Sequence, residues 1–90
     1  MGHIPESELI NRLDLANKKV EVGVRYRHSK SGSEVTVLHI GLTEDNEEPA
    51  VIYRHEDGAK IIWVRSVDEF TEEVEIDGKK VPRFTKIGHL

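Results

Sequence analysis

The spacing of apolar side chains changes near residue 20 and divides the chain into two parts. In the first part, Leu9, Leu13 and Ala16 recur at helical spacing with Ile10 beside them, a pattern typical of an amphipathic helix. Pro5 suits a first helical turn, and the acidic residues after it favour the positive end of the helix dipole. We therefore predict one helix of about three turns that caps the core, with docking of a partner as the alternative role.

From Val20 onward the period is two, which is typical of β-strands. In the stretch RYRHSKSG, which begins at Arg25, the alternation separates Tyr26 and His28 from Arg25 and Arg27. We expect Tyr26 to face the core and the two arginines to form the outer face of the strand. SKSGS is then a turn, EVTVLHIGL a second strand and TEDNEEP a polar loop.

A third and a fourth strand, PAVIYRH and KIIWVR, flank the turn residues Asp57-Gly58. A two-residue turn would set Ile52 opposite Trp63 and would place Ile52, Arg54, Ile61, Trp63 and Arg65 on one face. The favoured interpretation is that Trp63 belongs to the core, with the arginines reaching past it to water. The alternative is an exposed aromatic floor between Arg54 and Arg65, which could stack a base, a sugar or a peptide side chain.

The last third of the chain predicts a short helix followed by another hairpin. Ser66 and Glu69 form a capping box, which favours one helical turn near residues 66–70. The pair Asp77-Gly78 then predicts a tight turn that sets Val74 opposite Val81.

Short strands in a chain of 90 residues must curl on themselves to cover their edges. We predict a mainly β fold: a small SH3-like barrel or roll of five or six antiparallel strands, with the N-terminal α-helix and the one-turn helix. Residues 1–19 would form the helical extension and residues 20–90 the barrel domain. Because the first and last strands of such a barrel lie near each other, two basic stretches would become neighbours, namely Arg25 and Arg27 with Lys79, Lys80 and Arg83.

Composition excludes several classes of protein. The chain has no cysteine, hence no disulfide, thiolate nucleophile or cysteine-ligated metal, which fits a reducing compartment. No apolar run is long enough to span a bilayer and the N-terminus lacks a secretory signal, so we expect a cytoplasmic protein with no membrane partner. The net charge of −4 argues against a protein that coats nucleic acid through bulk electrostatics.

Several ordered motifs resemble a bacterial family of domains of unknown function, DUF1653. They are RYRH at 25–28, VIYR at 51–54, WVR at 63–65, and Phe70 followed by EEVEIDGKKVPRF at 72–84. The resemblance covers about Val22 to Ile87 and implies a compact SH3-like β-barrel, without implying an agreed activity. Ser29 stands where the family usually has an aromatic residue, and Ser66 stands where it usually has proline; the N-terminal helix lies outside the resemblance.

The histidines do not show the spacing of a metal site. His28, His39 and His55 fall in separate strands, and neighbouring strands lie roughly 5 Å apart, so a cluster is geometrically possible. The favoured interpretation is that each one ends a strand, half exposed. We assign no catalytic residue, no metal ligand and no cofactor.

Three hypotheses of function follow. The first is a non-catalytic interaction module that binds a protein or peptide, or associates with itself through an edge strand, the helix or the Trp63 surface. The second is a nucleic-acid or nucleotide binder with a basic patch beside an aromatic side chain. The third is an enzyme whose acid and base meet only in the fold. The candidate binding residues are Arg25, Arg27, Arg54, Trp63, Arg65, Lys79, Lys80 and Arg83.

Overall fold

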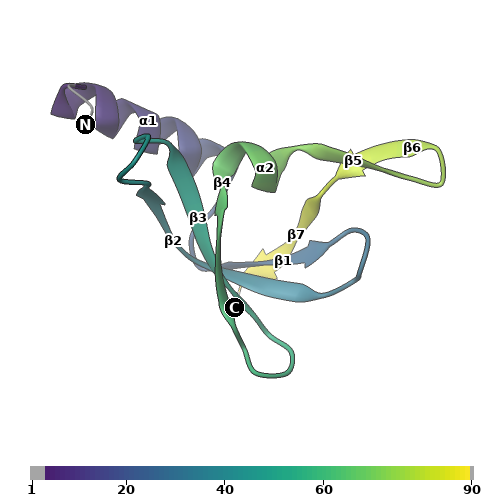
Figure 1. Ribbon diagram of the computed structural model, residues 1–90. Helices are drawn as coiled ribbons and strands as arrows, with labels where there is room; N and C mark the ends of the chain where they lie inside the picture. Colours follow the sequence, from purple (N-terminus) through teal and green to yellow (C-terminus); the bar gives the residue numbers. More distant parts are fainter. Residues whose placement is uncertain (1–3, 90) are drawn as a thin grey trace.

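A computed structural model describes residues 4–89, and within them the fold is mainly β (Figure 1). The strands form one five-stranded antiparallel sheet, in the order β4-β3-β2-β1-β7, and a separate hairpin of β5 and β6. In chain order the elements are α1 (Glu6–Lys19), β1 (Val24–His28), β2 (Glu34–Leu42), β3 (Pro49–His55), β4 (Ile62–Ser66), α2 (Val67–Thr71), β5 (Glu73–Ile76), β6 (Lys79–Pro82) and β7 (Phe84–His89).

The sheet does not close into a barrel, so the prediction of a closed shell is wrong. Its edges are β4 and β7. After β4 the chain enters α2 instead of returning to pair with β7, and β5 and β6 pair with each other in a hairpin that projects away from the sheet (Figure 1). The sheet is nevertheless strongly curled. The evidence is a contact between Tyr53 of β3 and Phe84 of β7, two strands that are separated in the sheet by β2 and β1.

The core lies on the concave, inner face of this curled sheet. α1 contributes Ala16 and α2 contributes Phe70, whose ring lies between those of Tyr26, Tyr53 and Phe84 at centroid distances of 5.4, 5.5 and 4.2 Å. Tyr26 is buried, as predicted, while its strand neighbours Arg25 and Arg27 lie on the opposite face. The other buried members of this cluster are Val20, Val24, Val35, Val37, Val51 and Val67.

Elements specified by local interactions form where the sequence predicts them. α1 spans the predicted apolar stripe and contains an Arg12–Glu8 pair one turn apart, with 3.4 Å between Nε and Oε2. At the start of α2 the Ser66 hydroxyl accepts a hydrogen bond of 3.1 Å from the Glu69 N–H, as a capping residue does. The hairpin of β5 and β6 has the predicted register, with Val74 opposite Val81.

The register of the hairpin of β3 and β4 differs from the prediction by one residue. Tyr53, and not Ile52, lies opposite Trp63. The chain does not turn in two residues: the His55 N–H donates to the Ile61 carbonyl at 3.0 Å, and the backbone between them includes Lys60 at a φ of 55°. Trp63 therefore shares the inner face with Tyr53, whereas Ile52 and Arg54 belong to the outer face. The prediction that Ile52, Arg54 and Trp63 share one face is wrong.

Among the described residues, no helix is both long and apolar enough to cross a membrane.

Candidate functional site

Three of the arginines predicted to bind a ligand are engaged in ion pairs on the outer face. Arg25 and Arg27 both pair with Glu34, with N–O distances of 3.5 and 3.1 Å. Arg54 pairs with Glu56 at 3.3 Å, and Arg25 approaches the same carboxylate at 4.0 Å. Adjacent strands bring these groups together, because Arg25 and Arg27 lie on β1 beside Glu34 of β2. Each of the three arginines is thus paired within the protein, with two carboxylates shared among three guanidinium groups.

The second predicted basic stretch adjoins the first along the backbone, but its side chains have different surroundings. β1 pairs with β7, and the Ser29 N–H donates to the Arg83 carbonyl at 2.8 Å. Arg83 itself turns to α2 and β5: its Nε donates to the Glu69 carbonyl at 3.0 Å, and its guanidinium pairs with Glu72. Lys79 and Lys80 are exposed on the projecting hairpin, with Lys80 opposite Glu75. The contacts thus divide the predicted basic residues among three places.

Trp63 is half exposed, at 50%, so its interpretation as a core residue is wrong. The reason is the open sheet, since β4 is an edge strand. Its neighbours are also exposed: Ile61 at 52%, Ile62 at 57% and Val64 at 64%. Four consecutive large apolar residues on an unpaired edge form an unusual surface, because natural edges are commonly blunted by charge, proline or bulges.

A line of ring contacts crosses the inner face and reaches this edge. The ring centroids are 4.9 Å apart for His28 and Phe84, 5.6 Å for Phe84 and Tyr53, 6.3 Å for Tyr53 and His55, and 6.4 Å for His55 and Trp63. We call these five residues the aromatic arc. Because β7, β1, β3 and β4 all contribute to it, the arc exists only in the curled sheet.

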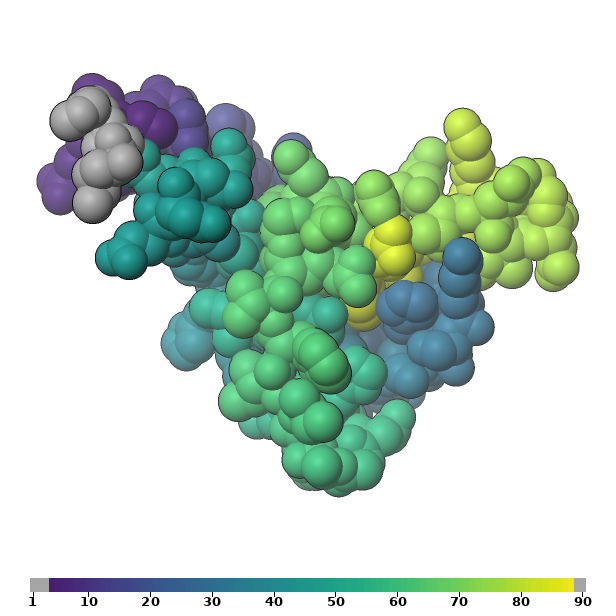
Figure 2. All heavy atoms as spheres, in the orientation of Figure 1, coloured from purple at the N-terminus to yellow at the C-terminus, as the bar shows by residue number. Residues whose placement is uncertain are grey.

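Cationic side chains gather around the arc. Burial is the largest cause of the lowered pKa of His28. The charges of Arg83, Arg65, His55 and Lys30 lower this pKa further. Within residues 4–89, neither Arg65, which is partly buried, nor the exposed Lys30 has an ion pair or a side-chain hydrogen bond. Figure 2 shows that the segments carrying these side chains meet on one face of the molecule. β7 (yellow) is recessed there, with the turn after β1 (blue) on one side and β4 and α2 (green) on the other.

Sequence reasoning assigned no binding role to the two histidines of the arc, although a repeated triplet signals them. Tyr-Arg-His occurs at residues 26–28 and again at residues 53–55. The period of two places each histidine on the same face as its tyrosine. His39 does not join them, because it lies opposite Ile52 on the outer face after a register shift in β2. No group of three or more histidine, aspartate or glutamate side chains in the described part of the chain is placed to hold a metal ion.

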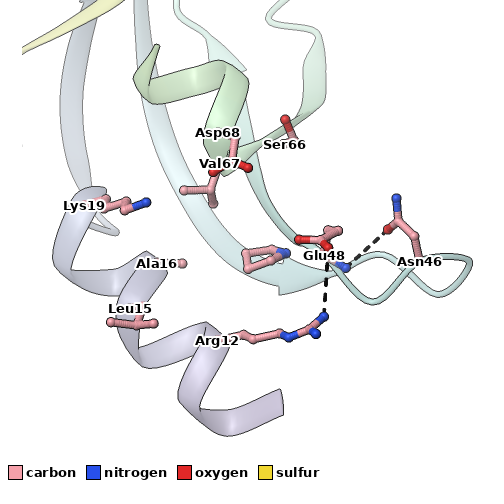
Figure 3. Close-up of a pocket in the computed structure, with 10 residues that line it drawn as sticks. Arg12, Leu15, Ala16, Lys19, Asn46, Glu48, Ser66, Val67 and Asp68 are labelled. Atoms are coloured by element: carbon pink, nitrogen blue, oxygen red, sulfur yellow. Dashed lines mark hydrogen bonds and ion pairs between the residues drawn. The ribbon is translucent and has the colours of Figure 1, made fainter. Parts of the chain in front are cut away.

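A separate cavity of about 570 Å³ lies between α1, the start of β3 and the start of α2 (Figure 3). Its main cation is already engaged: Arg12 donates to the Glu47 carbonyl at 2.9 Å and approaches the Glu48 carboxylate at 4.0 Å. Lys19 and Asp68 line it from the two helices. The cavity thus contains the Arg12–Glu48 pair, two further charged side chains and Leu15 and Ala16 of α1, and we assign no chemistry to it.

These features define a class of protein: a small, mainly β domain with an open, curled sheet, an apolar edge strand and a cationic aromatic arc. The model of the family described as "Protein of unknown function (DUF1653)" matches residues 24–86, and the chain belongs to this family. The fold is similar to the crystal structure of a DUF1653 protein from Bordetella bronchiseptica, with a TM-score of 0.68 and 25% sequence identity over 81% of this chain and 94% of that one. No curated protein matches the chain.

Proposed function

We propose that this protein is a non-catalytic interaction module that associates with a second copy of itself by pairing β4 with β4. The observation that carries the proposal is the edge strand itself, which exposes four consecutive large apolar residues, Ile61 to Val64. An edge strand also presents backbone N–H and C=O groups that another strand can pair with. Pairing would cover the apolar side chains and satisfy these groups together.

The hydrogen-bond pattern of β3 and β4 identifies the backbone groups of β4 that are free to pair. In an antiparallel ladder, alternate residues exchange hydrogen bonds with the partner strand. The bond from His55 to Ile61 shows that Ile61 is turned towards β3, and Trp63 and Arg65 share its orientation. The N–H and C=O groups of Ile62 and Val64 must therefore point away from the sheet.

A two-fold axis at Trp63 makes this edge complementary to itself. Ile62 of each copy then lies opposite Val64 of the second copy, so the outward backbone groups meet as hydrogen-bonded pairs. Trp63 meets its counterpart at a non-hydrogen-bonded position, where side chains approach most closely and aromatic pairs stabilise a sheet. Lys60 falls opposite Ser66 and Arg65 opposite Ile61, so the register places no like charges directly opposite each other.

The other edge of the sheet is less suited to such pairing. β7 includes Lys86 and Gly88, and the Lys86 ammonium forms an ion pair with Glu21. Each edge strand has one lysine or arginine, Lys86 in β7 and Arg65 in β4, but β7 exposes one large apolar side chain, Ile87 at 38%, whereas the edge at β4 exposes four. The contrast between the two edges favours β4 as the surface for association.

The test is the mass of the protein in solution, measured by sedimentation equilibrium for the wild type and for Val64→Pro. We expect a dimer for the wild type. Because the Val64 N–H points away from β3, proline at this position removes an intermolecular bond and leaves the β3–β4 ladder intact, so Val64→Pro should be monomeric with an unchanged circular dichroism spectrum. Ile10→Lys, at a residue of α1 with 51% exposure, is the matched control and should remain dimeric. A wild type that stays monomeric at millimolar concentration would overturn the proposal.

A further inference from the structure

We propose that the aromatic arc, together with Arg65 and Lys30, is a binding site for a phosphorylated planar ring, with a mononucleotide as the chemical class of ligand. The site lies on the inner face. Because self-association would bring Trp63 against its counterpart, binding is measured on the Val64→Pro monomer as well as on the wild type, so that failure of one proposal is distinguished from failure of the other. Its two requirements are an accessible aromatic surface for the ring and uncompensated cations for the phosphate. The rings are accessible at Trp63 and His55, and the cations act on His28, with His55 common to both groups.

The accessible part of the arc is its β4 end. Tyr53 and Phe84 are buried and make the floor, whereas Trp63 is half exposed and His28 and His55 are partly exposed. A base that stacks on an aromatic side chain gains about 1–3 kcal/mol. Trp63 offers the largest ring, and His55 lies beside it with its plane inclined by 63°. These two residues can hold a ring at the open side of the sheet.

The cations around the arc suit a phosphate. Arg65 has the planar guanidinium fork that binds phosphate through two parallel hydrogen bonds. Neither Arg65 nor Lys30 pairs with a carboxylate of the described chain, in contrast to the arginines of the outer face. Every charge that perturbs His28 is cationic, since Arg83, Arg65, His55 and Lys30 are the four concerned. Arg83 is itself paired with Glu72, so Arg65 and Lys30 are the two cations of this group available to an anion, although the whole protein has a net charge of −4.

The number of free cations favours a mononucleotide over a nucleic-acid strand. A strand requires a basic track that follows successive phosphates. Arg25, Arg27 and Arg54 could extend such a track only if their pairs with Glu34 and Glu56 broke, and they lie on the outer face. The arc thus offers one place for a ring and one group of cations for the phosphate beside it.

The experiment uses Trp63 as the reporter, because it is the single tryptophan of the chain. We expect AMP to quench its fluorescence at low salt in a saturable way, and adenosine and inorganic phosphate each to bind at least about tenfold more weakly, because each supplies only one of the two contacts. Arg65→Gln should weaken AMP binding by about tenfold or more. Arg27→Gln, the same change on the outer face, should leave the affinity unchanged.

The pH profile gives a second readout. Burial and the neighbouring cations hold the pKa of His28 below 6.5, and as the pH falls through that lowered pKa His28 gains a proton and a positive charge, so AMP should then bind the wild type more tightly relative to His28→Gln. The ratio of the two affinities removes the titration of the phosphate itself, which also occurs near pH 6. Three outcomes would overturn the proposal: no saturable quenching, equal effects of Arg65→Gln and Arg27→Gln, or an oligonucleotide of eight uridines that binds far more tightly than UMP and loses that affinity in Arg27→Gln.

Discussion

At the scale of single residues, the hydrogen bonds and ion pairs of the outer face centre on one carboxylate, that of Glu56. Glu56 accepts hydrogen bonds from the Thr36 hydroxyl and from Arg54, and Thr36 is only 2% exposed. The hydrogen bond from Thr36 is the largest cause that holds the pKa of Glu56 below its usual value. The charges of Arg54 and Arg25 lower this pKa further. The Nε atoms of Arg25 and Arg54 are buried without a hydrogen-bond partner among the described residues, and Glu56 is the carboxylate that both guanidinium groups approach through a terminal nitrogen.

We therefore expect Glu56→Gln to lower the free energy of unfolding by about 1–3 kcal/mol at neutral pH, the usual loss when a buried charged hydrogen-bonding group loses its partner. The lowered pKa means that Glu56 contributes stability above pH 4.5, and this contribution is lost as the pH falls through the pKa of the folded state. Urea unfolding at neutral pH and again well below pH 4.5 should show the difference between wild type and variant shrinking in acid. Glu73→Gln, at an exposed carboxylate of β5, is the control, and equal stability of both variants at neutral pH would contradict this role.

At the scale of elements, the sequence determines what is local. α1, the cap of α2 and the hairpin at Asp77-Gly78 each depend on residues within a few positions of one another, and all three form as predicted. The hairpin of β3 and β4 misled the prediction because Lys60 adopts a positive φ, which is uncommon for lysine. A non-glycine residue in that conformation leaves no signal in the sequence, and the shift of one residue puts Trp63 on the face of Tyr53 and not on that of Ile52 and Arg54.

The cap of α2 can be tested directly. Ser66→Ala removes the acceptor for the Glu69 N–H and should destabilise the protein by about 1 kcal/mol. The effect should reach the core, because α2 positions Phe70 among the rings of β1, β3 and β7. Ser66→Asp keeps an acceptor at the cap and should retain most of the stability in the same urea titration. If Ser66→Ala and Ser66→Asp lost the same free energy, the cap would not be the cause.

At the scale of the whole molecule, the arrangement on which the proposed functions rest was the least predictable. Alternation along each strand correctly placed Tyr26 inside and Arg25 and Arg27 outside. Whether the sheet closes depends on how β4, α2 and β7 pack against one another, which no short stretch of sequence specifies. The aromatic arc has the same origin: His28, His55 and Trp63 are distant in the chain, and only the curvature of the sheet joins them through Tyr53 and Phe84.

An open sheet makes two aromatic residues differ in their contribution to stability, and this difference tests the fold as a whole. Phe70 is 1% exposed and contacts three rings, so Phe70→Ala should cost about 3–5 kcal/mol. Trp63 is half exposed on an edge strand, so Trp63→Ala should cost the monomer only about 1 kcal/mol, roughly half the value for a fully buried large side chain. Both variants should be unfolded in urea in the Val64→Pro background, which removes any contribution of self-association. If Trp63→Ala proved as costly as Phe70→Ala, the sheet would have to close over Trp63 in solution, and the exposed edge and the accessible end of the arc would both be lost.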